Sequence, residues 1–211
     1  MASVTYPNGQ VLTSTALTVQ QMNILLQSLT CGALGLPLPK AAQPSGYAAV
    51  RTDWPVEGQP FVPTPAVDGC FLACVTEDTP YNKVRNRTFT GDGPVVEQWT
   101  YTRGWRVSWT LYGPNCADRA RQLWSAFAFM DYFADALSLS NLFVVTDPAE
   151  PTYMPETFNA QWWPRADFAV SMYENVTETI DDGKAVSVEV KVYDADVFTT
   201  GPAADVTITA A

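Results

Sequence analysis

The chain contains no histidine, and its 12 lysines and arginines are outnumbered by 22 aspartates and glutamates. Histidine is the usual proton shuttle near neutral pH, so its absence removes the commonest general acid or base. The net charge of −10 opposes attraction to DNA phosphates or anionic lipid over the surface as a whole. No segment reaches the roughly 20 apolar residues that span a bilayer. We therefore expect no membrane partner and no tight binding of nucleic acid.

Sequence motifs for metal binding and catalysis are also missing. The four cysteines, Cys31, Cys70, Cys74 and Cys116, lack the paired spacing of a zinc site. No P-loop, Rossmann glycine pattern or Gly-x-Ser-x-Gly motif occurs. Asp181 and Asp182 are adjacent carboxylates, but a following glycine between two alternating segments indicates a turn. We predict no catalytic residue, no cofactor and no metal, and so a protein that is not an enzyme.

The most informative stretch of the chain is Trp99–Trp124. Its apolar residues alternate with polar ones, which predicts a long strand with one buried face formed by Trp99, Tyr101, Trp105, Val107, Trp109 and Leu111. Gly113-Pro114 then breaks the strand, and Asn115 with Asp118 supplies acceptors for the first turn of a helix. That helix is expected to continue to Leu137 with an apolar arc of roughly 220°. Such an arc needs more than one covering partner, either a second helix of this chain or a neighbouring subunit.

The remaining elements complete an α+β pattern. Thr18 and Gln21 form a capping box at the start of a first helix. Short strands are predicted at residues 47–52, 70–76 and 142–146, and residues 166–172 and 186–192 are predicted to pair as an antiparallel hairpin. The expected fold is a mainly antiparallel sheet of about five strands with two helices packed on one face, plus extended loops or arms.

The stretch from Glu77 to Gln98 is long for an ordinary connection and carries several cations. Long loops in compact domains are often functional, so we interpret it as a flexible or hairpin-like arm that contacts a neighbour. The residues predicted to make subunit or partner contacts are Tyr81, Lys83, Arg85 and Arg87 on the arm, with Arg119 and Arg121 near the start of the second helix.

Cations concentrate in the middle of the chain, whereas aspartate and glutamate dominate after Asp147. In a homo-oligomer, the basic part of one copy could meet the acidic part of the next in a heterologous interface that closes a ring. The alternative is that these charges form solvated faces, as most surface charges do.

Several ordered motifs resemble a known family. The runs TRGWRVSWTLYGPNCADRA, FNAQWWPRADF, VRTDWPVEGQPF and EDTPYN are similar to stretches of the neck or tail terminator proteins of tailed bacteriophages. The likeness covers about residues 48–194. We accordingly divide the chain into an N-terminal segment with a helix and a Pro/Gly-rich linker (1–46), a terminator-like α+β domain (47–194) and an acidic C-terminal tail (195–211).

The resemblance implies a structural virion protein made in the host cytoplasm and located at the tail-neck junction. Such a protein forms a ring, usually hexameric, that caps the tail tube, stops its polymerisation and joins the tail to the head-neck connector. The implied partners are further copies of itself, the tail tube protein and the neck or connector protein, with genomic DNA passing through the ring without sequence-specific binding.

A different class of function uses the tryptophans. Trp99, Trp105, Trp109, Trp162 and Trp163 could form an aromatic platform for sugar rings, which would make the chain a tail or baseplate component that binds a carbohydrate receptor. The first three share a face with Val107 and Leu111, which favours a core position for them. Trp162 and Trp163 point to opposite faces, so one of the two could be exposed.

Overall fold

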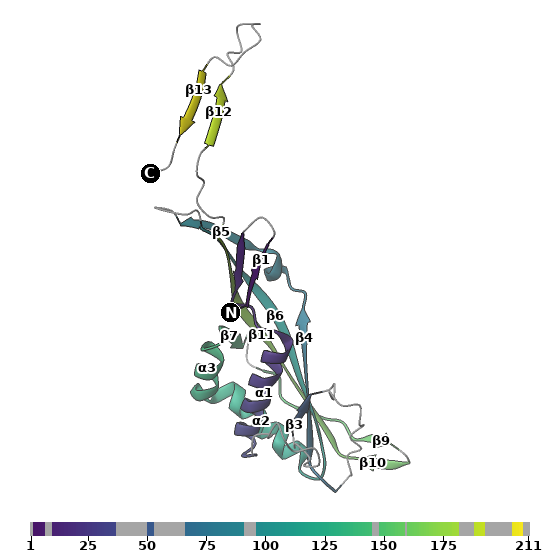
Figure 1. Cartoon of the computed structure of the whole chain (residues 1–211). Helices are drawn as coiled ribbons and strands as arrows, with labels where there is room; N and C mark the ends of the chain where they lie inside the picture. The colour runs from purple at the N-terminus through teal and green to yellow at the C-terminus, as the bar shows by residue number, and fades with distance from the viewer. Residues whose placement is uncertain are drawn as a thin grey trace. The chain divides into compact units, whose positions relative to one another are not determined.

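The computed structural model describes residues 2–6, 10–36, 50–52, 66–90, 96–144, 148–158, 160–181, 188–192 and 204–208. The chain divides into two compact units (Figure 1). Unit 1 comprises Met1–Thr15, Asn86–Thr100 and Thr177–Ala211, and unit 2 comprises Ala16–Arg85 and Tyr101–Val176. Two long strands, β6 (Val96–Tyr112) and β11 (Arg165–Asp181), contribute residues to both units.

The fold is α+β and dominated by its sheet, as predicted, but the sheet is larger than expected. It contains nine strands rather than about five, with the order β1-β2-β11-β6-β4-β3 along its main path and with β5, β7 and β8 attached beside it. The described residues form three α-helices instead of the two expected. Most pairings are antiparallel, whereas β3 (Val50–Thr52) runs parallel to β4 (Gly69–Glu77). Short strands at the sheet margin, with weak sequence patterns, account for most of the difference.

Unit 2 holds the hydrophobic core between its sheet and its helices. Figure 1 shows α1 (Val19–Ala33), α2 (Cys116–Phe129) and α3 (Asp131–Ser138) on one side of the strands. The predicted alternation of β6 is confirmed from Trp105 onward, since Trp105, Val107, Trp109 and Leu111 are all buried. Trp99 and Tyr101, which were predicted on the same buried face, are only half-buried. The neighbouring strand of the same sheet, β11, buries every second residue from Ala166 to Val176. The rings of Trp109 and Phe168 stack with centroids 5.2 Å apart, which joins the two strands at the centre of the core.

The predicted helix from Cys116 to Leu137 is interrupted at Met130. Met130 has an extended backbone (φ −93°, ψ 111°), so α2 ends before it and α3 begins after it. Phe127 and Phe133 lie six residues apart, which would place them about 120° apart around one continuous helix. The break allows both rings to be buried and to contact each other with centroids 5.4 Å apart. Another helix of the same chain, α1, packs against α2. It therefore provides part of the cover that the wide apolar arc was expected to need.

The predicted N-terminal cap is present at α1 and absent at α2. At α1, Thr18 and Gln21 make the predicted capping box. At α2, Asn115 makes no side-chain cap, and the predicted capping role is wrong. The Asn115 backbone N–H and its side-chain amide both donate to the carboxylate of Asp68, at 3.0 and 3.1 Å. The side chain of Asn115 is therefore occupied by a loop that is distant in sequence.

The described elements of unit 1 are all strands. β1 (Ala2–Thr5) pairs with β2 (Val11–Ser14), and β2 pairs with the end of β11 from Glu178 to Asp181. β5 (Arg85–Thr90) pairs with β6. The predicted arm at residues 77–98 thus contains a short 3-10 helix, Pro80–Lys83, followed by an antiparallel strand pair. The residues that join the two strands, 91–95, lie outside the described part of the chain.

The predicted hairpin between residues 166–172 and 186–192 is wrong. β12 (Val188–Val192) pairs with β13 (Ala204–Ile208) in a separate two-stranded sheet. β11 pairs instead with β2, β6, β7 (Leu142–Val144) and β8 (Thr152–Tyr153). The valine alternation in β12 correctly indicated a strand, but alternation does not specify the partner. The predicted turn at Asp182-Gly183 lies outside the described residues.

Candidate interaction surfaces

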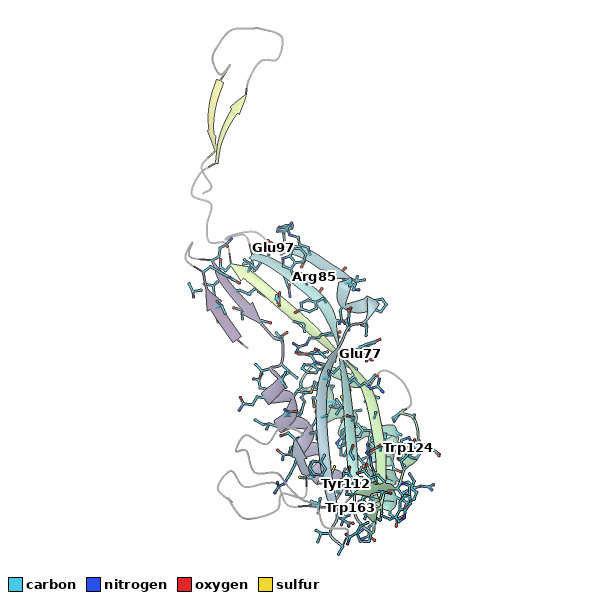
Figure 2. The ribbon with its side chains drawn as sticks, turned by 90° about the vertical axis from the view of Figure 1, so that its right-hand side faces the viewer. Glu77, Arg85, Glu97, Tyr112, Trp124 and Trp163 are labelled. Atoms are coloured by element: carbon cyan, nitrogen blue, oxygen red, sulfur yellow. The ribbon has the colours of Figure 1, made fainter. Side chains whose placement is uncertain are left out.

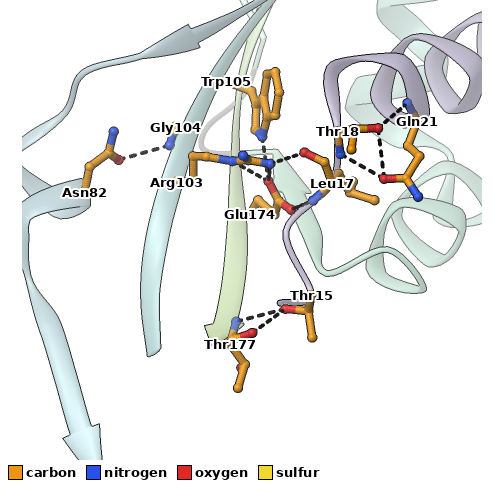
Figure 3. A network of polar contacts seen from close by, with 10 residues as sticks. All are labelled: Thr15, Leu17, Thr18, Gln21, Asn82, Arg103, Gly104, Trp105, Glu174 and Thr177. Atoms are coloured by element: carbon orange, nitrogen blue, oxygen red, sulfur yellow. Dashed lines mark hydrogen bonds and ion pairs between the residues drawn. The ribbon is translucent and has the colours of Figure 1, made fainter. Parts of the chain in front are cut away.

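A buried carboxylate, Glu174, organises the largest polar network of unit 2 (Figure 3). Its residue is only 1% exposed, and its two oxygens accept four hydrogen bonds. The donors are the Leu17 backbone N–H at 2.6 Å, the Trp105 indole N–H at 2.7 Å, and the Arg103 guanidinium through Nε and NH2 at 2.8 and 2.5 Å. Arg103 also donates to the Leu17 carbonyl, so this network fixes the start of α1 to the sheet.

The sequence contained a signal for this network that our prediction did not use. Arg103 occupies a position on the apolar face of β6, between Tyr101 and Trp105. Glu174 likewise occupies a core-facing position of β11, between Met172 and Val176. A buried charge requires a partner of opposite charge. A cation on the core face of one strand and an anion on the core face of another therefore indicate an ion pair between the two strands.

In unit 1, the arm carries a compact group of cation and aromatic side chains. The Arg87 guanidinium forms an ion pair with Glu97, whose side chain is nearly buried. It also lies over two rings, 4.5 Å from the Phe89 centroid and 5.2 Å from the Trp99 centroid. Cation–aromatic contacts of this kind stabilise by about 0.5–1 kcal/mol each at exposed sites. Arg87 therefore stiffens the strand pair, while Phe89 remains 58% exposed.

The other predicted contact residues of the arm belong to unit 2. Arg85 is exposed, and its guanidinium lies 5.6 Å from the Tyr101 ring centroid. Lys83 forms a long ion pair with Asp78, at 3.6 Å between two largely exposed side chains, which contributes little to stability. The backbone of Tyr81 lies in the 3-10 helix. The side chain of Asn82 fixes this segment to the sheet, because its oxygen accepts from the Gly104 N–H at 3.0 Å.

The two predicted contact residues on α2 differ in their surroundings. Arg119 is bound within the chain, since its Nε donates to Asp68 at 2.8 Å. Burial alone would raise the pKa of the Asp68 carboxyl, but hydrogen bonds from Asn115 and Arg119 outweigh it and hold that pKa below its ordinary value. Arg121 is exposed and lines an open pocket of about 220 Å³ that also includes Trp124. Among the described residues Arg121 has no ion-pair partner, so of these two arginines it is the available one.

A second polar cluster of unit 2 lies at the end of β6. The Tyr112 hydroxyl donates to Glu156 at 2.7 Å, and Arg165 pairs with both Glu156 and Asp167 at 2.6 and 2.9 Å. Burial first, and then the hydrogen bond to Glu156, raise the pKa of Tyr112 to about 12. The hydrogen bond from Tyr112, followed by that from Arg165, lowers the pKa of Glu156. Figure 2 shows Tyr112 close to Trp163 at this end of the sheet.

Trp163 belongs to a small two-stranded sheet of β9 (Glu156–Phe158) and β10 (Gln161–Trp163). Its residue is buried, and its ring meets that of Tyr112 edge to face with centroids 6.3 Å apart. Trp162, the adjacent residue, is 72% exposed. The prediction that one of these two tryptophans is exposed is confirmed. One exposed ring is not a platform, because Trp105 and Trp109 are fully buried.

Large apolar side chains are exposed at both ends of α3. Phe129 and Met130 precede it, and Leu139, which is 88% exposed, follows it. The opposite side of α3 buries Phe133 and Leu137. Exposed apolar groups gathered on one element, rather than scattered singly, are typical of an interaction surface.

No catalytic constellation emerges from these groups. Within the part of the chain that the structure describes, no cluster of three or more cysteine, aspartate and glutamate side chains is suited to hold a metal ion. The four cysteines, all within the described residues, form no disulfide bond. Burial raises the pKa of Cys31 and Cys116, which makes them poor nucleophiles. No described helix is long and apolar enough to cross a membrane. The described surface carries exposed cations and exposed apolar side chains, which are groups suited to contacts with another protein.

Comparison with known proteins gives one result that bears on this interpretation. The model of a family described as phage neck terminator protein matches residues 20–196. This range includes the second polar cluster, the Glu174 cluster except Leu17, all three helices except the first residue of α1, and the predicted contact residues. No curated protein matches the chain.

Proposed function

Since the chain belongs to the phage neck terminator protein family, we propose that it is the tail terminator of a tailed bacteriophage. Family membership assigns it a structural role in the tail and neck of the virion. The proposal adds the mechanism: the protein caps the tail tube, stops its polymerisation and joins the tail to the head-neck connector. The match over residues 20–196 is the single observation that carries it.

In the proposed mechanism the protein acts by shape. Copies associate in a closed ring, expected to be a hexamer, with one surface matching the last ring of tube subunits and the opposite surface matching the connector. An occupied tube end has no free site for another tube subunit, so growth stops. The net charge of −10 would keep passing genomic DNA from adhering to the ring. The partners are thus other copies of the chain, the tube protein and the connector protein.

Of the residues predicted to contact partners, those without an ion pair inside the chain support this proposal best. Arg119 and Arg87 are engaged by Asp68 and Glu97 within the chain, so their first role is to hold loops and strands in place. Arg85 and Arg121 are exposed, and neither has an ion pair among the described residues. We propose that these two meet a neighbouring protein without first giving up an ion pair within the chain.

Deleting the gene and complementing it in infected cells tests the function. Without the protein, we expect tails that are longer than normal or unjoined to heads, because nothing occupies the growing end. Complementation with the wild-type chain should restore joined particles, and a label fused to the chain should appear at the head-tail junction in electron micrographs. Tails of normal length that join heads in the absence of the protein would refute the proposal.

A second candidate function rests on Trp162. Its 72% exposed ring, on a two-stranded sheet that extends from unit 2, could contact a sugar ring of a receptor. A glycan array together with fluorescence quenching of Trp162 by oligosaccharides separates the two functions, with Trp162→Ala as the matched control. A terminator should give no response in either assay, whereas quenching that disappears in Trp162→Ala would favour the receptor-binding function.

A further inference from the structure

The exposed face of α3 carries acidic side chains followed by a large apolar one. Helical residues three and four apart lie on one face, and the exposed residues follow this spacing: Asp131, Ala134, Asp135, Ser138 and Leu139. Two carboxylates one turn apart are therefore followed by a large apolar side chain that is 88% exposed. Neither carboxylate has an ion-pair or hydrogen-bond partner among the described residues. We call these five residues the α3 face.

The edge strand β5 carries two basic side chains followed by an aromatic one, which matches the two acidic side chains and the apolar one of the α3 face. Arg85, Arg87 and Phe89 alternate along it and share one face of the strand. Every residue from Arg85 to Phe89 is exposed. Arg85 has no carboxylate partner among the described residues, whereas Arg87 pairs with Glu97 through Nε. A guanidinium has five N–H donors, so Arg87 can also donate to a second carboxylate.

The spacings of the two elements agree. Residues four apart on a helix are separated by about 6 Å along its axis. Residues two apart on a strand are separated by about 6.7 Å. Over three consecutive positions the two ladders diverge by only about 1.4 Å, which long side chains absorb easily.

We propose that the α3 face is the docking site for β5 of a second copy of this chain. Arg85 meets Asp131, Arg87 meets Asp135, and Phe89 packs on Leu139. The interface is heterologous, because β5 of one copy contacts α3 of the next, and heterologous contacts close into rings. The inference rests on the proposed function, since it names the surfaces through which the ring of terminators would assemble.

Charge reversal tests the proposed register at the pair Arg85–Asp131. We expect Arg85→Glu and Asp131→Arg, each alone in the full chain, to reduce the number of joined particles by more than about tenfold in the complementation assay, because like charges would face each other. The double variant, with both changes in one chain, should return the number to within about twofold of wild type, because it restores every interface in a ring of any size.

Two controls make the result specific. Asp118→Arg reverses an equally exposed carboxylate in the first turn of α2, and combined with Arg85→Glu it should not restore joined particles. Thermal unfolding of each purified variant checks that the chain is folded, and the neutral pair Arg85→Gln and Asp131→Asn replaces any reversal that unfolds early. The neutral variants should each lose joined particles without mutual rescue.

The inference and the proposed function fail in different ways. Single reversals that leave joined particles unchanged, or folded double variants that do not recover them, would overturn the docking site while the labelled wild-type chain still appears at the junction. Rescue of Arg85→Glu by Asp135→Arg instead of Asp131→Arg would overturn the register. A wild-type chain absent from the junction would overturn the proposed function, and the docking site with it.

Discussion

The Arg103–Glu174 pair offers the strongest test of how the fold is held together. Arg103→Met removes the cation but leaves the carboxylate of Glu174, which is 1% exposed, with only the Leu17 and Trp105 donors. Breaking a buried pair by removing one partner typically costs about 3–5 kcal/mol, because the remaining charge stays buried without compensation. For a chain of this size, we expect the melting temperature to fall by about 6–20 °C.

A double-mutant cycle separates the interaction from the loss of side-chain packing. Glu174→Gln keeps a carbonyl oxygen for the Leu17 or Trp105 donor and removes the charge. The variant with both changes should therefore be less destabilised than Arg103→Met alone, with a coupling free energy of about 1–3 kcal/mol. Denaturant titration measures the free energy of unfolding for each variant.

The adjacent arginine of the same strand provides the control. Arg106 is exposed on the opposite face of β6, and no ion pair engages it among the described residues. Arg106→Met should change the free energy of unfolding by less than about 0.5 kcal/mol. Equal losses for Arg103→Met and Arg106→Met, or a coupling energy near zero, would refute the reasoning. Hydrogen exchange should also report faster exchange at the Leu17 amide in Arg103→Met only.

Three further predictions concern titration and thiol reactivity. The carboxyls of Asp68 and Glu156 have a lower pKa in the folded chain than in the unfolded one, so the stability they contribute at neutral pH should be lost as the pH falls through the folded pKa values. Asp68→Asn and Glu156→Gln should therefore each reduce the loss of unfolding free energy on the acid side of a plot against pH. Tyr112 has the opposite sign: its pKa of about 12 exceeds the unfolded value, so its contribution should be complete below about pH 10 and disappear toward pH 12, and Tyr112→Phe should remove that alkaline slope. Finally, Cys74 alone among the four cysteines is not buried, so a thiol reagent should label one site quickly in the native chain, and Cys74→Ser should abolish the fast phase; fast labelling of more than one thiol would contradict the core packing.

The parts of the fold that the sequence predicted are those with a strong local pattern. The alternation in β6 from Trp105 onward and the capping box of α1 were both confirmed, because each depends on residues close together in sequence. The break at Met130 could not be read locally, since no proline or glycine marks it. It follows from the need to bury Phe127 and Phe133 on the same side, which is a property of the assembled core.

Strand partners were the least predictable feature. β12 alternates valine with polar residues, and so does much of the sheet, so its pattern fits several neighbours equally well. The actual partner, β13, lies in a tail that the sequence indicated only as acidic and rich in alanine and threonine. The short strands β1, β2 and β8 have too few residues for a periodic pattern and were not predicted, which explains much of why the predicted sheet was too small.

The cations in the middle of the chain show how structure changes the meaning of a charge pattern. Seven lysines and arginines between residues 83 and 121 suggested one basic surface: Lys83, Arg85, Arg87, Arg103, Arg106, Arg119 and Arg121. Four of them pair with carboxylates of the same chain: three are held closely by Glu97, Glu174 and Asp68, and Lys83 forms a longer pair with Asp78. A partner therefore meets far less positive charge than the sequence implies, and its specificity depends on where the remaining cations stand. Arg85 on an edge strand, followed at the right spacing by an exposed phenylalanine, carries more information for recognition than the number of charges does.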